Sequence, residues 1–133
     1  MKIRSLELSL LVGSFAVCRL EPDAPIPTWA LQGGFFSATR TPHELSIVCE
    51  EALVPLGARH RGGWRLFKVH GPFDFSEVGV VASLAVPLAE AGISLFIVST
   101  FDTDYLLVPS DNVEAAMAAL VKAGHRVSRS QGE

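Results

Sequence analysis

The sequence has no apolar run that approaches the ~20 residues needed to cross a membrane. It is also poor in positive charge, with 11 Lys and Arg against 14 Asp and Glu and a net charge of −3. The basic residues are scattered, and the densest group is Arg59-His60-Arg61. Because binding to nucleic-acid phosphates needs clustered Lys and Arg, we expect neither a nucleic acid nor a membrane as partner. A hydrophobic content of 49% against 19% charged residues excludes intrinsic disorder.

Motifs typical of catalysis or cofactor binding are missing as well. The sequence contains no P-loop, zinc pattern, nucleophile elbow or dinucleotide fingerprint. The four histidines lack the spacing of metal ligands, so we expect them to be exposed or to lie in loops: His43, His60, His70 and His125. We therefore predict a protein that is not an enzyme, has no catalytic residues and holds no metal and no cofactor.

Cysteine is rare, and the two cysteines, Cys18 and Cys49, form no CxxC pair. Each lies in a predicted strand, which favours two buried, reduced thiols. The N-terminus carries Lys2 and Arg4 before an apolar stretch, as a secretory signal does. Glu7 interrupts that stretch, and it alternates like strands on either side of Gly13, so we expect a cytoplasmic protein without a signal peptide.

The C-terminal half predicts strand, helix, strand, strand, helix and strand, in the residue ranges 64–70, 78–91, 93–98, 105–108, 111–123 and 125–128. Pro87 predicts a kink or break in the first helix, because it removes the hydrogen bond to the Ser83 carbonyl. Asp111 and Glu114 predict a capping box at the start of the second helix, which Gly124 ends. This order is that of an α+β, ferredoxin-like βαββαβ fold with an antiparallel sheet and the helices on one face.

The N-terminal half resembles a shortened copy of the same pattern. The sequence of residues 15–20 resembles that of residues 64–69, and residues 39–51 resemble residues 99–111 at an offset of 60. Only short helical turns fit where the second half has helices. We therefore predict a tandem duplication with a degenerate first copy, as two domains covering residues 1–61 and 62–133. The continuous apolar strands also predict a homodimer.

Two loops of the second copy are candidates for ligand binding. The first, Gly71 to Gly79, joins a strand to a helix N-terminus, where unpaired amides and the positive end of the helix dipole favour a carboxylate. The alternative is that Asp74 or Ser76 only caps the helix. The Gly33-Gly34 and Gly62-Gly63 pairs, by contrast, fit turns before strands.

The second loop, Ser99 to Asp104, holds more hydroxyl and carboxylate groups than a tight hairpin needs. Its side chains suit an ammonium or another cationic group. The alternative is a solvated turn rich in capping residues. In a ferredoxin-like sheet this loop and the start of the first helix lie close together, so the two loops are expected to line one cleft.

These residues carry a resemblance to a known family. The segments 64–69, 71–75, 87–96 and 99–108 resemble ACT domains, and most of all the CASTOR-type subgroup, which includes arginine sensors of the TOR pathway and small bacterial proteins. Residues 36–49 resemble the first-half signature of the same bacterial group. The resemblance implies tandem ACT domains that bind an amino acid or a similar small molecule at a domain interface. By position, the contacts would be Asp74, Phe75, Ser76, Val78, Gly79, Ser99, Thr100, Phe101, Thr103 and Asp104.

The sequence favours a ligand-binding regulatory module over three other functions. A structural or protein-interaction module without a ligand stays open as the alternative. An enzyme of the acylphosphatase type on this fold would need an Arg in a phosphate-cradling loop, and neither helix-one loop contains it. An RNA-binding sheet would need exposed aromatic RNP motifs and basic charge, which the sequence lacks.

Overall fold

The computed structural model describes residues 5–72 and 78–130. The chain divides into two compact units. One unit is residues 13–64, and the other combines the segment up to Val12 with the segment from Arg65 onward. Each unit is described by itself below.

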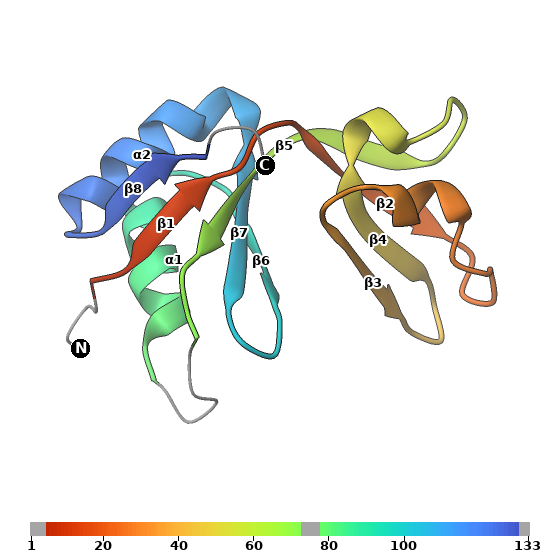
Figure 1. Ribbon diagram of the computed structural model, residues 1–133, viewed down its shortest axis with the longest axis horizontal. Helices are drawn as coiled ribbons and strands as arrows, with labels where there is room; N and C mark the ends of the chain where they lie inside the picture. Colours follow the sequence, from red (N-terminus) through yellow and green to blue (C-terminus); the bar gives the residue numbers. More distant parts are fainter. Residues whose placement is uncertain (1–4, 73–77, 131–133) are drawn as a thin grey trace. The chain divides into compact units, whose positions relative to one another are not determined.

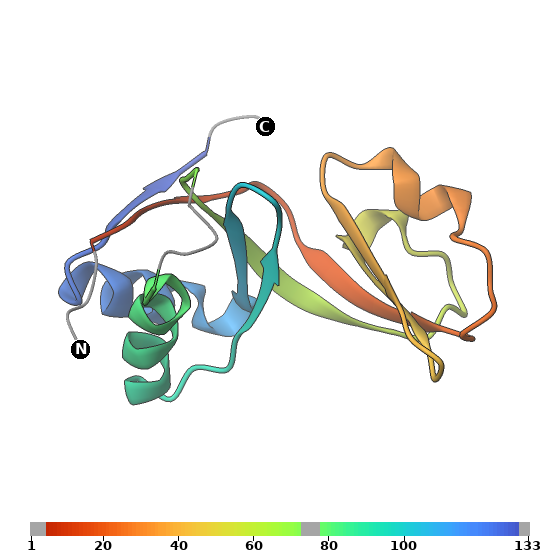
Figure 2. The ribbon, with the colours of Figure 1, turned by 90° about the horizontal axis from the view of Figure 1, so that it is seen from below.

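The discontinuous unit contains a five-stranded sheet with two helices. Its strands lie in the order β6-β7-β5-β1-β8, and β5 contributes the part of its length that follows Trp64. The elements are β1 (Glu7–Leu10), β5 (His60–Val69), α1 (Val80–Glu90), β6 (Phe96–Ser99), β7 (Asp104–Pro109), α2 (Val113–Lys122) and β8 (Arg126–Arg129). Both helices pack on the same face of the sheet, where Leu84 and Leu120 share one core with Leu8, Phe67 and Leu106 (Figure 2). The α+β class and the helices on one face confirm the prediction.

The N-terminal strand β1 changes the predicted sheet. In Figure 1 it lies between β5 and β8, which the ferredoxin-like order would place side by side. Leu8 pairs antiparallel with Val69 of β5 and parallel with Val127 of β8, so the sheet is mixed, and the predicted fully antiparallel sheet is wrong here. Leu8 and Leu10 are buried in the core. The observed units therefore differ from the predicted division at residues 61 and 62, because β1 completes the sheet of the second half.

The continuous unit contains β2 (Phe15–Leu20), β3 (Phe36–Arg40), β4 (Leu45–Glu50) and the first residues of β5 in the order β3-β4-β2-β5. Two short 3-10 helices, η1 (Thr28–Gln32) and η2 (Glu51–Leu53), stand in the chain where the other unit has its α-helices. Prolines crowd the segment before η1, and proline cannot donate the backbone hydrogen bonds of a longer helix. The small core contains both cysteines together with Ala16, Ala30, Leu45 and Ile47.

The two units repeat one pattern of strand pairing. Strands β2-β4-β3 follow the same order as β5-β7-β6. Matching hairpin turns connect the last two strands, with the N–H of Thr41 donating to the Glu44 carbonyl and that of Thr100 donating to the Thr103 carbonyl. Strands β4 and β7 also share the same sequence of buried and half-buried positions. The structural offset in this region is 59 residues, one fewer than the predicted 60, since Thr41 corresponds to Thr100.

Carboxylates fill the space that the two glycine pairs leave open. Glu50 accepts a hydrogen bond from the Gly34 N–H, and a Cβ at Gly33 would stand 2.3 Å from the same carboxylate. Glu51 accepts hydrogen bonds from the Gly63 N–H and the Ser14 hydroxyl, which lower the pKa of its carboxyl. The pair Gly62-Gly63 lies inside β5, so the predicted turn at this position is wrong.

The helices differ from their predictions at two points. Helix α1 continues through Pro87 to Glu90, so the predicted break is absent. Helix α2 begins after a 3-10 turn, η3 (Ser110–Asn112), and its N-cap makes no side-chain hydrogen bond, so the capping box is not formed. Glu114 instead pairs with Arg129 at 2.6 Å.

A buried histidine replaces the hydrogen bond that Pro87 removes. His125 lies in the loop between α2 and β8, as expected for a histidine in a loop, but it is only 3% exposed. Its Nε2 lies 2.7 Å from the Ser83 carbonyl, and its Nδ1 accepts a hydrogen bond of 3.0 Å from the Leu6 N–H. Because an N–H can only donate and a carbonyl can only accept, the ring is neutral with its proton on Nε2.

We expect His125→Ala to lower the free energy of unfolding by about 2–4 kcal/mol, since it leaves the Leu6 N–H and the Ser83 carbonyl buried without partners. In a Pro87→Ala background the loss should be smaller by about 1 kcal/mol, because the new N–H reaches the Ser83 carbonyl. Urea unfolding of the double-mutant cycle measures this coupling. Pro55→Ala, in the other unit, is the control background, and an equal loss in both backgrounds would contradict the assignment.

The two thiols are free and buried, as predicted. Burial raises the pKa of Cys49 to about 12, with further contributions from Cys18 beside it and from Glu50. Burial also raises the pKa of Cys18, and its hydrogen bond with Cys49 opposes this. Both thiols are therefore unreactive hydrophobic groups of the core at neutral pH.

Above the ordinary thiol pKa of 9.0 the unfolded chain loses the Cys49 proton, while the folded chain keeps it up to about pH 12. The free energy of unfolding should therefore fall as the pH rises through this window, by up to about 1.4 kcal/mol per pH unit for this thiol. Urea unfolding between pH 8.5 and pH 10.5 should show a shallower fall for Cys49→Ala than for the unchanged protein. Parallel pH profiles would refute the assignment, whatever the offset between them.

Candidate ligand-binding site

The structure describes two of the five residues predicted on the first loop. Asp74, Phe75 and Ser76 lie outside the described residues. Val78 is 89% exposed, and Gly79 is the N-cap of α1 with a positive φ of 90°. A side chain is strained in this left-handed conformation, so glycine suits the position.

The start of α1 has no acidic residue in its first turn and no side-chain cap from Gly79. The Gly79 carbonyl already accepts the Ser83 N–H, so the helix is fully formed from its first turn. Among the described residues no side chain caps the first-turn amides at Val80 and Val81, where the positive end of the helix dipole lies. The alternative cap by Asp74 or Ser76 falls on residues outside the described part.

The second loop is the hairpin between β6 and β7. Its turn is closed by the Thr100 N–H, which donates to the Thr103 carbonyl at 2.8 Å, and by the Thr103 N–H, which donates to the Thr100 hydroxyl at 3.2 Å. Ser99 and Asp104 face each other across the strands, and the Ser99 hydroxyl donates to the Asp104 carboxylate at 2.5 Å. Asp104 is only 9% exposed, whereas Phe101 at the tip is 78% exposed.

The hairpin is hydrogen-bonded to the end of β5, the strand that precedes the first loop. The Thr103 hydroxyl donates to the carbonyl of Val69, the last residue of β5. His70, Gly71 and Pro72 follow directly and lead into the first loop. The described part of the chain thus brings the Ser99–Asp104 hairpin beside the beginning of the Gly71–Gly79 loop. The single site formed by both loops and its individual contacts stay predictions.

Sequence reasoning did not anticipate a polar pair at the same strand end. His70 Nε2 lies 2.6 Å from the Ser9 hydroxyl, and the His70 N–H donates to the Glu7 carbonyl. Ser9 and Glu7 belong to β1, far from His70 in the sequence. No local pattern signals this contact, because it depends on the insertion of β1 beside β5.

The pocket between the two helices lies away from these loops. Its volume is about 330 Å³, and its lining comes from the ends of α1 and α2: Pro87, Glu90, Ala91, Ala119, Lys122 and Ala123. Within residues 5–72 and 78–130 there is no group of three or more His, Cys, Asp or Glu side chains placed to hold a metal ion. Over the same residues, no helix has the length and apolar character needed to span a membrane.

Two family models match the chain. A model described as ACT domain matches residues 59–122, which include both loops. A second model, described as the N-terminal domain of a group of related proteins, matches residues 13–56.

Curated relatives match over part of their length. The human cytosolic arginine sensor for mTORC1 subunit 1 is 43% identical over 58 residues, which cover 43% of this chain and 18% of the sensor. The Bos taurus protein of the same name gives the same values. The chain therefore matches less than a fifth of the length of these curated relatives.

Solved structures match over nearly the whole chain. A protein from Agrobacterium tumefaciens is 44% identical with a TM-score of 0.91, covering 98% of this chain and 97% of that one. A protein of unknown function from Vibrio cholerae, described as a possible transport protein, is 22% identical with a TM-score of 0.73, covering 90% and 91%. The regulatory subunit of aspartate kinase from Thermus thermophilus is 17% identical with a TM-score of 0.60, covering 92% and 99%.

The last two likenesses show a shared fold alone. The family follows from the Agrobacterium tumefaciens relative, from the ACT model over residues 59–122 and from the arginine-sensor match. The resemblance predicted from the sequence is thereby confirmed: the chain belongs to the ACT domain proteins and is related to the cytosolic arginine sensors.

Proposed function

We propose that this protein is a non-catalytic regulatory module that binds a small molecule, an amino acid by class, at the Gly71–Gly79 and Ser99–Asp104 loops. The observation that carries the proposal is the buried Asp104 carboxylate, held by Ser99 in a hairpin tied to the end of β5. A largely buried carboxylate at the base of an exposed loop is a strong acceptor for an ammonium group.

The two loops complement the two charged groups of an amino acid. Asp104 supplies a negative charge for the α-ammonium group of the ligand. The first-turn amides of α1, behind Gly79, supply donors for its α-carboxylate. The full set of contacts in this proposal is the one that the family resemblance implies: Asp74, Phe75, Ser76, Val78, Gly79, Ser99, Thr100, Phe101, Thr103 and Asp104.

The comparisons support the ligand class without fixing the ligand. The related proteins bear the name of arginine sensors, and the ACT model covers both loops. The same name describes those relatives as cytosolic, which agrees with the expected cytoplasmic location. A homodimer stays a prediction from the apolar strands.

The alternative function is a protein-interaction module without a ligand. Val78 and Phe101 favour it, because they place two large apolar side chains, 89% and 78% exposed, on the two loops. The experiment below separates the two functions.

We expect at least one of the twenty amino acids to raise the melting temperature of the full chain and to bind in calorimetric titration. Asp104→Asn should weaken this binding about tenfold or more, since a hydrogen bond to a charged group contributes about 1.5–3 kcal/mol. Asp102→Asn is the matched control, because Asp102 is an exposed carboxylate of the same hairpin. Its binding should equal that of the unchanged protein.

Ser99→Ala separates ligand binding from the shape of the hairpin. This variant removes the donor to Asp104 and keeps the carboxylate, so it should bind more tightly than Asp104→Asn. Absence of any shift or binding with all twenty amino acids would overturn the proposal and favour the interaction module. Equal weakening by Asp102→Asn and Asp104→Asn would remove Asp104 from the site.

A further inference from the structure

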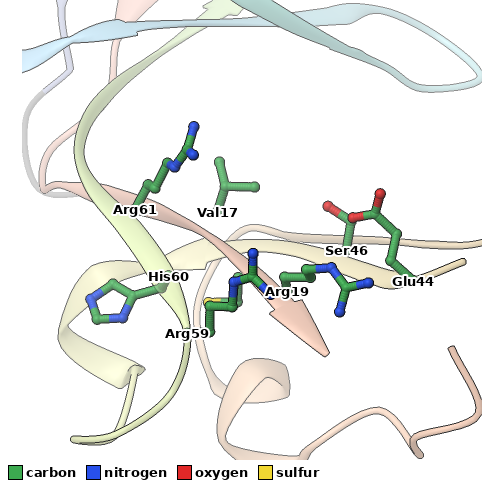
Figure 3. A pocket seen from close by; sticks show the side chains of 8 residues that line it. Val17, Arg19, Glu44, Ser46, Arg59, His60 and Arg61 are labelled. Atoms are coloured by element: carbon green, nitrogen blue, oxygen red, sulfur yellow. The ribbon is translucent and has the colours of Figure 1, made fainter. Parts of the chain in front are cut away.

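A cationic pocket lies on the sheet of the continuous unit. Its volume is about 410 Å³, and Figure 3 shows its lining: Val17, Cys18, Arg19, Glu44, Ser46, Arg59, His60 and Arg61. All of these residues belong to residues 13–64. A volume of this size suits a small organic molecule, since ligand pockets measure about 300–1,000 Å³.

Strand alternation places the arginines on the sheet face opposite the small core. Cys18 points into that core, so its neighbours Val17 and Arg19 point to the other face. Val17 pairs with Arg61 across β2 and β5, and the Arg19 N–H donates to the Arg59 carbonyl. Three guanidinium groups, from β2, from β5 and from the residue before β5, therefore gather on one surface, with Arg19 lying between Arg59 and Ser46 in Figure 3.

Arg19 is held in place and still has donors to offer. One terminal nitrogen of its guanidinium lies 3.3 Å from Glu21, and the other donates to the His43 carbonyl at 2.9 Å. These two contacts use two of the five N–H groups of the guanidinium. The side chain is 35% exposed, so a ligand can reach the remaining donors. Because the two existing contacts already hold the side chain, binding costs little further side-chain entropy.

Arg59 and Arg61 are unpaired among the described residues. Neither guanidinium makes a hydrogen bond or ion pair with a side chain or carbonyl of residues 5–72 and 78–130, and both residues are exposed. With His60 neutral, the three arginines against Glu44 give the lining a formal charge of +2 in a protein of net charge −3. Like charges on neighbouring strands repel each other, and a bound anion removes this repulsion.

We propose that this pocket binds a small organic anion. Arg19, Arg59 and Arg61 bind its carboxylate or phosphate groups. Guanidinium groups bind both kinds of oxyanion through paired N–H donors. Glu44 and Ser46 lie together at the end of the pocket away from Arg61, where a hydroxyl or an amine of the same ligand fits better than a second acidic group (Figure 3). The pocket shares no residue with the site of the proposed function and does not depend on that function.

The test is calorimetric titration of the full chain with inorganic phosphate and with succinate, at low and constant ionic strength. We expect saturable binding of at least one anion, weakened about tenfold by Arg59→Gln and by Arg61→Gln. Preference for phosphate or for succinate then identifies the acidic group of the natural ligand. Both arginines are exposed, so the melting temperatures without anion should change little.

Control variants locate the anion in this pocket. Arg126→Gln removes an exposed arginine of the other unit and should leave binding unchanged, as should Asp104→Asn. Glu44→Gln should tighten binding severalfold, since it removes a negative charge from the lining. Amide chemical shifts should move at Val17 and Ser46 and stay constant at Thr100. No saturable binding of either anion, or equal weakening by Arg126→Gln and Arg59→Gln, would overturn the proposal.

Discussion

The buried imidazole of His125 is the contact on which the larger unit depends. It joins three segments that are distant in sequence: the start of β1 at Leu6, the middle of α1 at Ser83 and the start of β8. Its two nitrogens satisfy one backbone donor and one backbone acceptor, and an unpaired group of either kind is costly in a core. The same contact explains why a helix tolerates Pro87 and why the N-terminal strand is fixed beside β8. The sheet that carries both ACT loops is completed by this strand.

The two units show how one pairing pattern serves two different surfaces. In the unit that contains β1, two α-helices cover one face of the sheet, and the loops at a strand end carry Asp104 and Gly79. In the unit of residues 13–64, short 3-10 helices cover a small core, and the opposite face carries Arg19, Arg59 and Arg61. The repeated hairpin turns at Thr41 and Thr100 preserve the backbone pattern, while the charged side chains differ, with Arg40 beside the first turn and Asp102 in the second. A protein of net charge −3 thus concentrates positive charge on one sheet face.

Several sequence patterns were correct because they rest on local chemistry. The strands at residues 15–20 and 105–108 and both helices of the second half follow from apolar periodicity and from Gly92 and Gly124 after the helices. The predicted capping box is not formed, and Glu114 pairs instead with Arg129, which only the fold brings near. The Gly62-Gly63 pair predicts a turn but lies inside β5, where the Glu51 carboxylate from another element fills the space beside it.

The element types, the α+β class, the ACT resemblance and the hairpin that holds Ser99 and Asp104 could be predicted from the sequence, since each depends on short segments of the chain. The position of β1, the burial of His125 and the grouping of Arg19 with Arg59 and Arg61 follow only from the folded structure. Apolar periodicity shows which side of a strand is buried but not which strand lies beside it. Pairing between distant segments is set by the whole core, and for this reason both β1 and the cationic pocket escaped prediction.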